Sequence, residues 1–204
     1  MTRIIVKYCV YLIICGAIFC MFYPLLQRAN ENPHAAPCQG NLKQIGLAIF
    51  EYAQDYNEKL PPAIFHDKYI GWANGLQPYA KSYSIFQCYA DQNPPQETPQ
   101  PDKPGFTDYW FNGNMAGVNE EKITSAFNLI MLGEGDGGSS DSTASYALNH
   151  FSTPWLQSSD SPIKRHLGGA NYAFADGHVK WFKPEGIIHI HSSNSEGLPT
   201  FSVH

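Results

Sequence analysis

The strongest constraint on the fold is a run of nineteen uncharged residues, from Tyr8 to Leu26. As a helix, this run is just long enough to cross the hydrocarbon core of a bilayer, so we expect a membrane anchor. Arg3 and Lys7 precede it, which by the positive-inside rule predicts a cytoplasmic start and an external globular part. The expected organisation is a start and anchor at 1–28, a linker at 29–37, a globular domain at 38–190 and a polar tail of no evident role at 191–204.

Three other interpretations of this run are open: a cleaved secretory signal, a lipoprotein signal and a buried core helix. A signal-peptidase site needs two small residues separated by one, but Ala35 and Ala36 are adjacent. The residues before Cys15 and Cys20 are bulky, whereas a lipoprotein signal has a small one there. A soluble core helix seldom runs this long without a strongly polar residue. The sequence therefore favours the anchor.

Composition limits the function classes. The 204 residues carry a formal charge of -5 with few charged side chains, so no basic face is available for nucleic acid. After the anchor, the chain has room for one domain of ordinary size. Fifteen prolines, seventeen glycines and twenty-eight aromatic residues suggest a loop-rich protein that contains a sheet.

Apolar residues at spacings of three and four predict an amphipathic helix that follows the linker and ends before Pro61. Its apolar side consists of Leu42, Ile45, Ile49, Tyr52, Ala53 and Tyr56. We expect strands in the run that ends at Ile85, Phe86 and Cys88, and at 106–112 and 128–134, the last buried on both faces. A single helical turn is expected between the last two strands, and a proline-rich loop at 91–104.

The dipeptide Asp176-Gly177 separates two strand-like runs and predicts a hairpin with a two-residue loop. In that register Phe174 faces Val179 and Tyr172 faces Trp181, and these four side chains form one core face. The hairpin accounts for Asp176-Gly177 without a catalytic or metal-binding role. His166 is expected to hydrogen-bond to the hairpin or its backbone.

Cys38 and Cys88 are the candidate disulfide. If the anchor prediction holds, both lie in an oxidising compartment, where a pair of cysteines is usually bonded. The bridge would close a loop of about fifty residues and stabilise the fold by roughly 4 kcal/mol. The alternative is a cysteine–histidine nucleophile, but neither cysteine has an adjacent basic residue that would lower its pKa.

Two groups of polar residues are candidates for a metal or acid/base site. One comprises His166, Asp176 and His178 with His189, His191 or His204 from the tail, and it matches no metalloenzyme spacing. The other comprises Glu134, Asp136 and Asp141 on a glycine-rich segment, where calcium binding stays open although the ligand spacing of a helix-loop-helix site is absent. We predict no catalytic, cofactor or metal residue, and a protein that is not an enzyme.

The residues also resemble a known group. His166, nine further residues and Asp176-Gly177 match the carboxyl-terminal motif of bacterial prepilin-like proteins, which are similar to type II secretion pseudopilins and carry the label domain of unknown function 1559. The helix from Cys38 and the run that ends at Cys88 resemble that group as well. The resemblance implies an α+β, pilin-like fold in which the helix packs on an antiparallel sheet.

The implied role is a single-pass structural protein of the bacterial cytoplasmic membrane, with its globular domain periplasmic or extracellular. Its partners would be the lipid bilayer and other pseudopilins or copies of itself, contacted through the amino-terminal helix. The chain departs from prepilins at their cleavage motif, since Gly16 is followed by AIFCM and Met21 stands where prepilins carry glutamate. The alternative is an anchored periplasmic or surface binding domain that does not polymerise, and whether the start of the chain is processed stays open.

Overall fold

A computed structural model describes residues 7, 11–12, 14–21, 35–65, 70–88, 99–187 and 199–203. The chain divides into two compact units, Met1–Pro33 and His34–His204. Residues 14–21 are helical, and within the described ranges no helix is long and apolar enough to cross a membrane. Residues 8–10, 13 and 22–26 of the expected anchor lie outside the described residues, as do 29–34 of the expected linker and 191–198 of the tail.

The amphipathic helix predicted from the apolar spacing is α2, Ala35–Asp55. Its predicted side is buried except at Tyr56, which lies beyond the helix end, is 51% exposed and stacks on Tyr52 with ring centroids 4.2 Å apart. The chain turns there because Asn57 and Glu58 take left-handed backbone conformations, with φ of 55° and 59°. The buried residues of α2 are Cys38, Leu42, Ile45, Gly46, Ala48, Ile49, Tyr52 and Ala53.

The prediction of a strand before Cys88 is wrong. This segment instead forms α3 (Trp72–Gly75), α4 (Gln77–Ala80) and the 3₁₀ helix η1 (Tyr83–Phe86). A proline in the first turn favours α4, and the Ser82 side chain caps η1 by accepting a hydrogen bond from the Ser84 amide. These local helical signals outweigh the β propensity of the aromatic residues, which serve as core packing instead.

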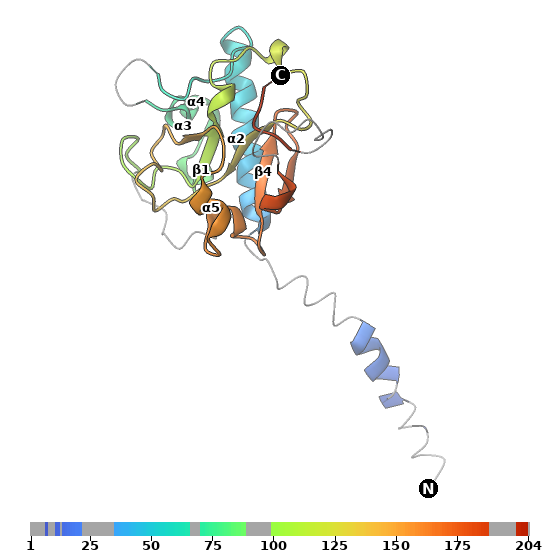
Figure 1. Cartoon of the computed structure of the whole chain (residues 1–204). Helices are drawn as coiled ribbons and strands as arrows, with labels where there is room; N and C mark the ends of the chain where they lie inside the picture. Colours follow the sequence, from blue (N-terminus) through green and yellow to red (C-terminus); the bar gives the residue numbers. More distant parts are fainter. Residues whose placement is uncertain are drawn as a thin grey trace. The chain divides into compact units, whose positions relative to one another are not determined.

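The sheet has five strands in the order β3-β1-β2-β4-β5. They are β1 (Tyr109–Asn112), β2 (Ile130–Glu134), β3 (Ala147–Leu148), β4 (Ala170–Phe174) and β5 (Val179–Phe182). Two of them, β1 and β4, are labelled in Figure 1. The expected strands at 106–112 and 128–134 are thus present, and β2 is buried along its whole length. The α+β prediction is confirmed, but the sheet is mixed because β3 pairs parallel with β1. The two residues of β3 carry no recognisable strand signal in the sequence.

The remaining short helices occupy the connections. The helical turn expected between β1 and β2 is present as η2 (Gly113–Met115) and η3 (Glu120–Lys122). After β3 the chain forms α5 (Thr153–Gln157) and η4 (Pro162–Lys164), and after β5 it forms η5 (Pro184–Gly186).

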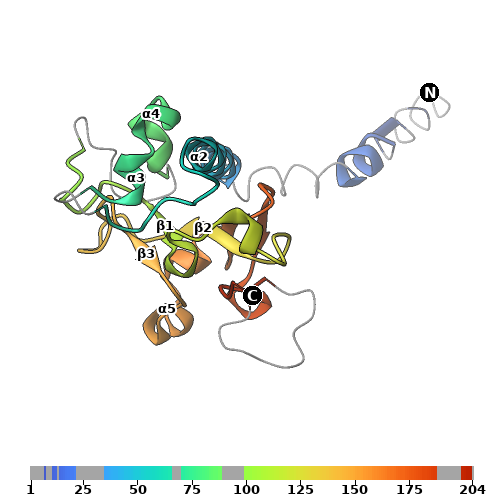
Figure 2. The same ribbon diagram turned by 90° about the horizontal axis from the view of Figure 1, so that it is seen from above.

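The sheet separates two apolar clusters. Helix α2 packs against β2, β4 and β5, and Figure 2 shows α2, α3 and α4 on one side of the strands and α5 on the other. The cluster on the α2 side includes Leu42, Ile45, Leu132 and Ala173. The cluster on the other side surrounds the buried Trp110 and includes Ile130, Phe151, Ile163, Tyr172, Phe174 and Phe201. Strands β2 and β4 are therefore buried from both faces.

The β4–β5 hairpin forms at the predicted place, but its predicted register is wrong by one residue. Ala173 pairs with Val179, and Tyr172 pairs with Lys180. Asp176 does not take a positive φ, whereas Gly177 has φ of 87°, so the loop has three residues instead of two. A shift of one residue in register moves the side chains of β5 to the opposite face of the sheet relative to β4. Val179 therefore packs into the cluster on the α2 side, while Tyr172 lies in the opposite cluster.

Candidate functional site

Three polar side chains meet inside the protein at the end of β2 and the start of β4. Glu134 is the last residue of β2 and is 0% exposed, and Asn171 of the neighbouring β4 is also 0% exposed. His166 precedes β4 in a tight turn, where its amide donates to the Gly169 carbonyl, and it is 1% exposed. The antiparallel pairing of β2 with β4 brings these residues together across more than thirty positions of sequence.

The carboxylate of Glu134 is the centre of this polar cluster. Its Oε1 lies 2.9 Å from His166 Nε2 and accepts a hydrogen bond from Asn171 Nδ2 at 2.8 Å. Its Oε2 accepts from the Asn171 backbone amide at 2.9 Å. Asn171 Oδ1 in turn accepts from Gln39 Nε2 of α2 at 2.8 Å. A buried carboxylate needs such donors, because desolvation of an unpaired charge is very costly.

Neighbouring groups respond to this buried charge. Burial, and secondly the charge of Glu134, raise the pKa of the Tyr109 hydroxyl well above its usual value, and Tyr172 shows the same causes in the same order. Arg165 opposes the shift at Tyr109, and its Nη2 donates to the carbonyl of Gly135 at 2.8 Å. The guanidinium therefore supplies positive charge beside the end of β2.

The expected disulfide between Cys38 and Cys88 is present and adjoins this polar cluster. Their Cα atoms lie 5.4 Å apart, and both residues are buried. The two sulfur atoms, one carboxylate oxygen of Glu134 and one ring nitrogen of His166 all lie within 4.8 Å of one another. All four residues are candidates from the sequence, but in separate features, because nothing in their spacing connects α2, the loop after η1, β2 and the turn before β4.

The rival histidine site does not assemble. His166 lies before β4, whereas Asp176 and His178 lie in the loop at the other end of that strand. Asp176 Oδ1 accepts from the His178 amide at 3.1 Å and lies 2.6 Å from His178 Nδ1, so these two residues stabilise their own turn. His189, His191 and His204 lie outside the described residues. The prediction that His166 bonds to the hairpin holds, since its carbonyl accepts from Trp181 Nε1 at 2.7 Å.

The three acidic residues that are candidates for calcium binding also serve separate local roles. Glu134 is directed into the polar cluster, while Asp136 Oδ1 accepts from the Gly138 amide at 3.0 Å. Asp141 Oδ1 accepts from Ser140 Oγ at 3.4 Å. Glu134 is thus the last residue of the strand predicted at 128–134 and is not part of the glycine-rich loop.

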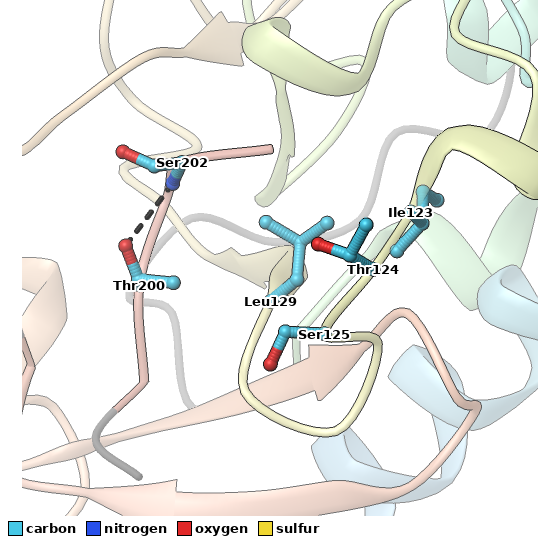
Figure 3. Close-up of a pocket in the computed structure, with 6 residues that line it drawn as sticks. All are labelled: Ile123, Thr124, Ser125, Leu129, Thr200 and Ser202. Carbon is cyan, nitrogen blue, oxygen red and sulfur yellow. Dashed lines mark hydrogen bonds between the residues drawn. The ribbon is translucent and has the colours of Figure 1, made fainter. Parts of the chain in front are cut away.

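A cavity of about 130 Å³ lies elsewhere, where the carboxyl-terminal segment pairs with the residue before β2 (Figure 3). Its wall is formed by Ile123, Thr124, Ser125, Leu129, Thr200 and Ser202. The Ser202 amide donates to Thr200 Oγ1 at 3.1 Å. These six side chains are apolar or hydroxyl-bearing, so they offer no acid, base or charged ligand for chemistry.

Comparisons with known proteins add one similarity. Residues 27–108, fewer than half of the chain, match a family described as a protein of unknown function, DUF1559. The match contains α2 and both cysteines of the disulfide, and it ends before His166, Asp176 and Gly177. No curated protein and no solved structure matches the chain.

Proposed function

We propose that this chain is a membrane-anchored, non-enzymatic, pseudopilin-like structural protein of a bacterial secretion or surface filament system. It would cross the cytoplasmic membrane once, with its amino terminus inside and its globular unit periplasmic or extracellular. The observation that carries the proposal is the position of α2, which begins at Ala35, shortly after the uncharged run ends at Leu26. The helix that follows the expected anchor is also the helix that buries its apolar side against the sheet.

A structural role is supported by the way the polar residues are used. Glu134, His166 and Asn171 direct their hydrogen-bonding atoms at one another and at the backbone, and each is at most 1% exposed. A substrate would have to displace buried, mutually satisfied groups to reach them. Asp176 and His178 are committed to a turn. Of the motif residues, His166 therefore belongs to the polar cluster and Asp176 to the turn between β4 and β5.

The outer side of α2 offers a surface for assembly. The apolar residues of α2 lie mainly on its buried side. Leu47 is an exception, because it points away from the sheet and is 54% exposed. In a filament built by helix packing, such a residue would contact a neighbouring copy. In an anchored binding domain that does not polymerise, the same residue would stay in contact with water.

The test combines membrane fractionation with chemical cross-linking of the full chain in its host membrane. We expect recovery with the membrane and a ladder of cross-linked oligomers. Leu47→Glu should remove the ladder without releasing the protein from the membrane. Ile64→Glu is the matched control, because Ile64 is 64% exposed but lies outside α2, and it should leave the ladder unchanged.

The outcomes separate the alternatives. A freely soluble full chain overturns the anchor and the whole proposal. A membrane-bound chain that gives no oligomers favours the anchored binding domain. A ladder that survives Leu47→Glu shows instead that the outer side of α2 is not the assembly surface. Mass spectrometry of the mature amino terminus then decides whether the chain is processed.

A further inference from the structure

Four side chains of the types that bind zinc converge on one point of the core. Cys38 comes from α2, Cys88 follows η1, Glu134 ends β2 and His166 precedes β4. One ligand atom from each lies within 4.8 Å of the other three, and all four residues are buried. Two of the four, Cys38 and Glu134, lie within regular elements, and the turn at His166 is closed by two backbone hydrogen bonds to Gly169.

We propose that, when the Cys38–Cys88 disulfide is reduced, these four residues form a tetrahedral binding site for a divalent transition metal of the zinc class. Two thiolates, an imidazole and a carboxylate suit such an ion, whereas calcium and magnesium prefer oxygen ligands alone. The site would exist before the disulfide forms or after it is reduced. The disulfide and the metal are then alternative cross-links for the same part of the core.

The geometry requires small movements. With metal–sulfur bonds of about 2.3 Å, the two sulfurs of a tetrahedral site are about 3.8 Å apart, which a reduced pair on Cα atoms 5.4 Å apart can reach by rotating about χ1. His166 Nε2 and Glu134 Oε1 are 2.9 Å apart and would separate to about 3.3 Å around the ion. His166 must then carry its proton on Nδ1, so that Nε2 is available to the metal.

The chemical balance is simple. A dithiol reductant gives two electrons and two protons to the sulfur–sulfur bond, which breaks into two thiols while the dithiol becomes a disulfide. Binding of the cation then releases both thiol protons. The ion, two thiolates and the Glu134 carboxylate sum to one negative charge, and the guanidinium of Arg165 beside the end of β2 offsets it.

Surrounding groups already orient two of the ligands. Asn171 donates to both oxygens of Glu134, and Gln39 holds the Asn171 side chain from α2. The amide of Cys88 donates to Asp108 Oδ2 at 2.5 Å, which fixes the backbone at that cysteine. Loss of an outer partner of this kind typically lowers metal affinity by roughly 10–100-fold.

The test uses the full chain with Cys9, Cys15 and Cys20 changed to Ser, so that these three cysteines cannot contribute. The protein in detergent is reduced with dithiothreitol, desalted without oxygen and titrated with cobalt(II) chloride. We expect one equivalent to bind, with a near-ultraviolet thiolate-to-cobalt band and intense visible bands of tetrahedral cobalt. Zinc should abolish both, and the oxidised chain should show neither.

Variants identify the ligands. In this background Cys38→Ser with Cys88→Ser should abolish the charge-transfer band, and Glu134→Gln should weaken cobalt binding more than about 100-fold. Gln39→Ala should weaken it by about 10-fold through Asn171. Gln44→Ala is the matched control because Gln44 is an exposed residue of the same helix, and it should leave the affinity unchanged.

Several results would overturn the proposal. They are a reduced chain that binds no cobalt, an octahedral spectrum without a thiolate band, and equal affinities for Gln39→Ala and Gln44→Ala. Circular dichroism covers the remaining case, because a reduced chain that unfolds and does not refold when cobalt is added also contradicts it. None of these readouts depends on membrane anchoring or filament assembly, so the two proposals fail independently.

Discussion

Glu134 has three hydrogen-bonding groups around one buried carboxylate, and two of them can only donate. His166 can change tautomer and act as donor or acceptor, but the amide and the side-chain Nδ2 of Asn171 cannot accept. The two oxygens of Glu134 are therefore both required at the junction of β2 and β4. Glu134 accepts hydrogen bonds from these buried donors and so holds the start of β4 in place.

Glu134→Gln is expected to lower the free energy of unfolding by about 1–3 kcal/mol, because either orientation of the new amide directs its NH₂ group at an Asn171 donor. Urea denaturation of the oxidised protein measures the loss. Glu121→Gln, at an exposed position, should change the value by less than about 0.5 kcal/mol. Equal stability of the two variants would show that the donors around Glu134 find other partners.

Glu120 provides the pH-dependent prediction. Burial, and then the nearby charge of Glu58, raise the pKa of Glu120 above its ordinary 4.5, and its Oε1 is a buried atom with no hydrogen-bond partner among the described residues. A raised folded-state pKa means that the stability linked to this group is fully present below the ordinary value. That stability is lost as the pH rises through the pKa of Glu120 in the folded protein.

Glu120→Gln should therefore raise the melting temperature near neutral pH, where the wild-type carboxylate is charged. The gain should vanish below pH 4.5, where the wild-type group is neutral like the amide. Thermal unfolding followed by circular dichroism across this range checks both parts. Glu121→Gln, at the exposed neighbouring position, serves as the control. A gain of the same size at every pH would mean that charge is not its cause.

At the scale of elements, the β4–β5 hairpin depends on one glycine. The Gly177 amide donates to the Phe174 carbonyl, and the Phe174 amide donates to the His178 carbonyl, so the loop closes around a residue with φ of 87°. A side chain is strained in that conformation. The loop length set here decides which residues of β5 face α2.

Gly177→Ala should lower the free energy of unfolding by about 1–2 kcal/mol, as expected for a non-glycine residue in the left-handed region. Gly40→Ala makes the same chemical change in α2, where Gly40 is exposed and open space surrounds the new methyl group. That variant should gain about 0.5–1 kcal/mol. Chemical denaturation of both tests the opposite signs, and a loss in both would mean that hairpin geometry is not the cause.

At the scale of the whole molecule, the disulfide joins the main helix to the segment that precedes β1. Cys38 and Cys88 are 50 residues apart, and the loop they close contains α3, α4 and η1. The bridge restricts the unfolded chain, and its loop length predicts a contribution of roughly 4 kcal/mol. A small domain with long proline-rich connections benefits strongly from such a cross-link.

Replacement of both Cys38 and Cys88 by Ala should therefore lower the free energy of unfolding by roughly 4 kcal/mol, measured by denaturant titration without reductant and without metal. Replacement of Cys15 and Cys20 by Ala is the control. Both are free and exposed and belong to the other unit, so the transition of the globular unit should not move. A loss below about 1 kcal/mol would show that the bridge contributes little.

The sequence by itself determined the features that depend on near neighbours. The spacing of Leu42, Ile45 and Ile49 predicted the buried side of α2, and the apolar run before Glu134 predicted a strand covered on both faces. Asp176-Gly177 marked the hairpin. The pairing of Cys38 with Cys88 also followed, because the anchor prediction implied an oxidising compartment for those two cysteines.

Only the tertiary structure decided which distant groups meet. The hairpin register differs by one residue because Gly177 takes a positive φ and Asp176 does not, which gives a loop of three residues. The aromatic run before Cys88 became helical, since local capping and packing against α2 outweigh β propensity. Glu134 and His166 are 32 residues apart and meet because β2 and β4 pair, and no local pattern encodes that contact. Helix periodicity and turn type depend on residues that are close in the sequence. The contacts of a buried carboxylate with its donors form only when the sheet and the helix pack together.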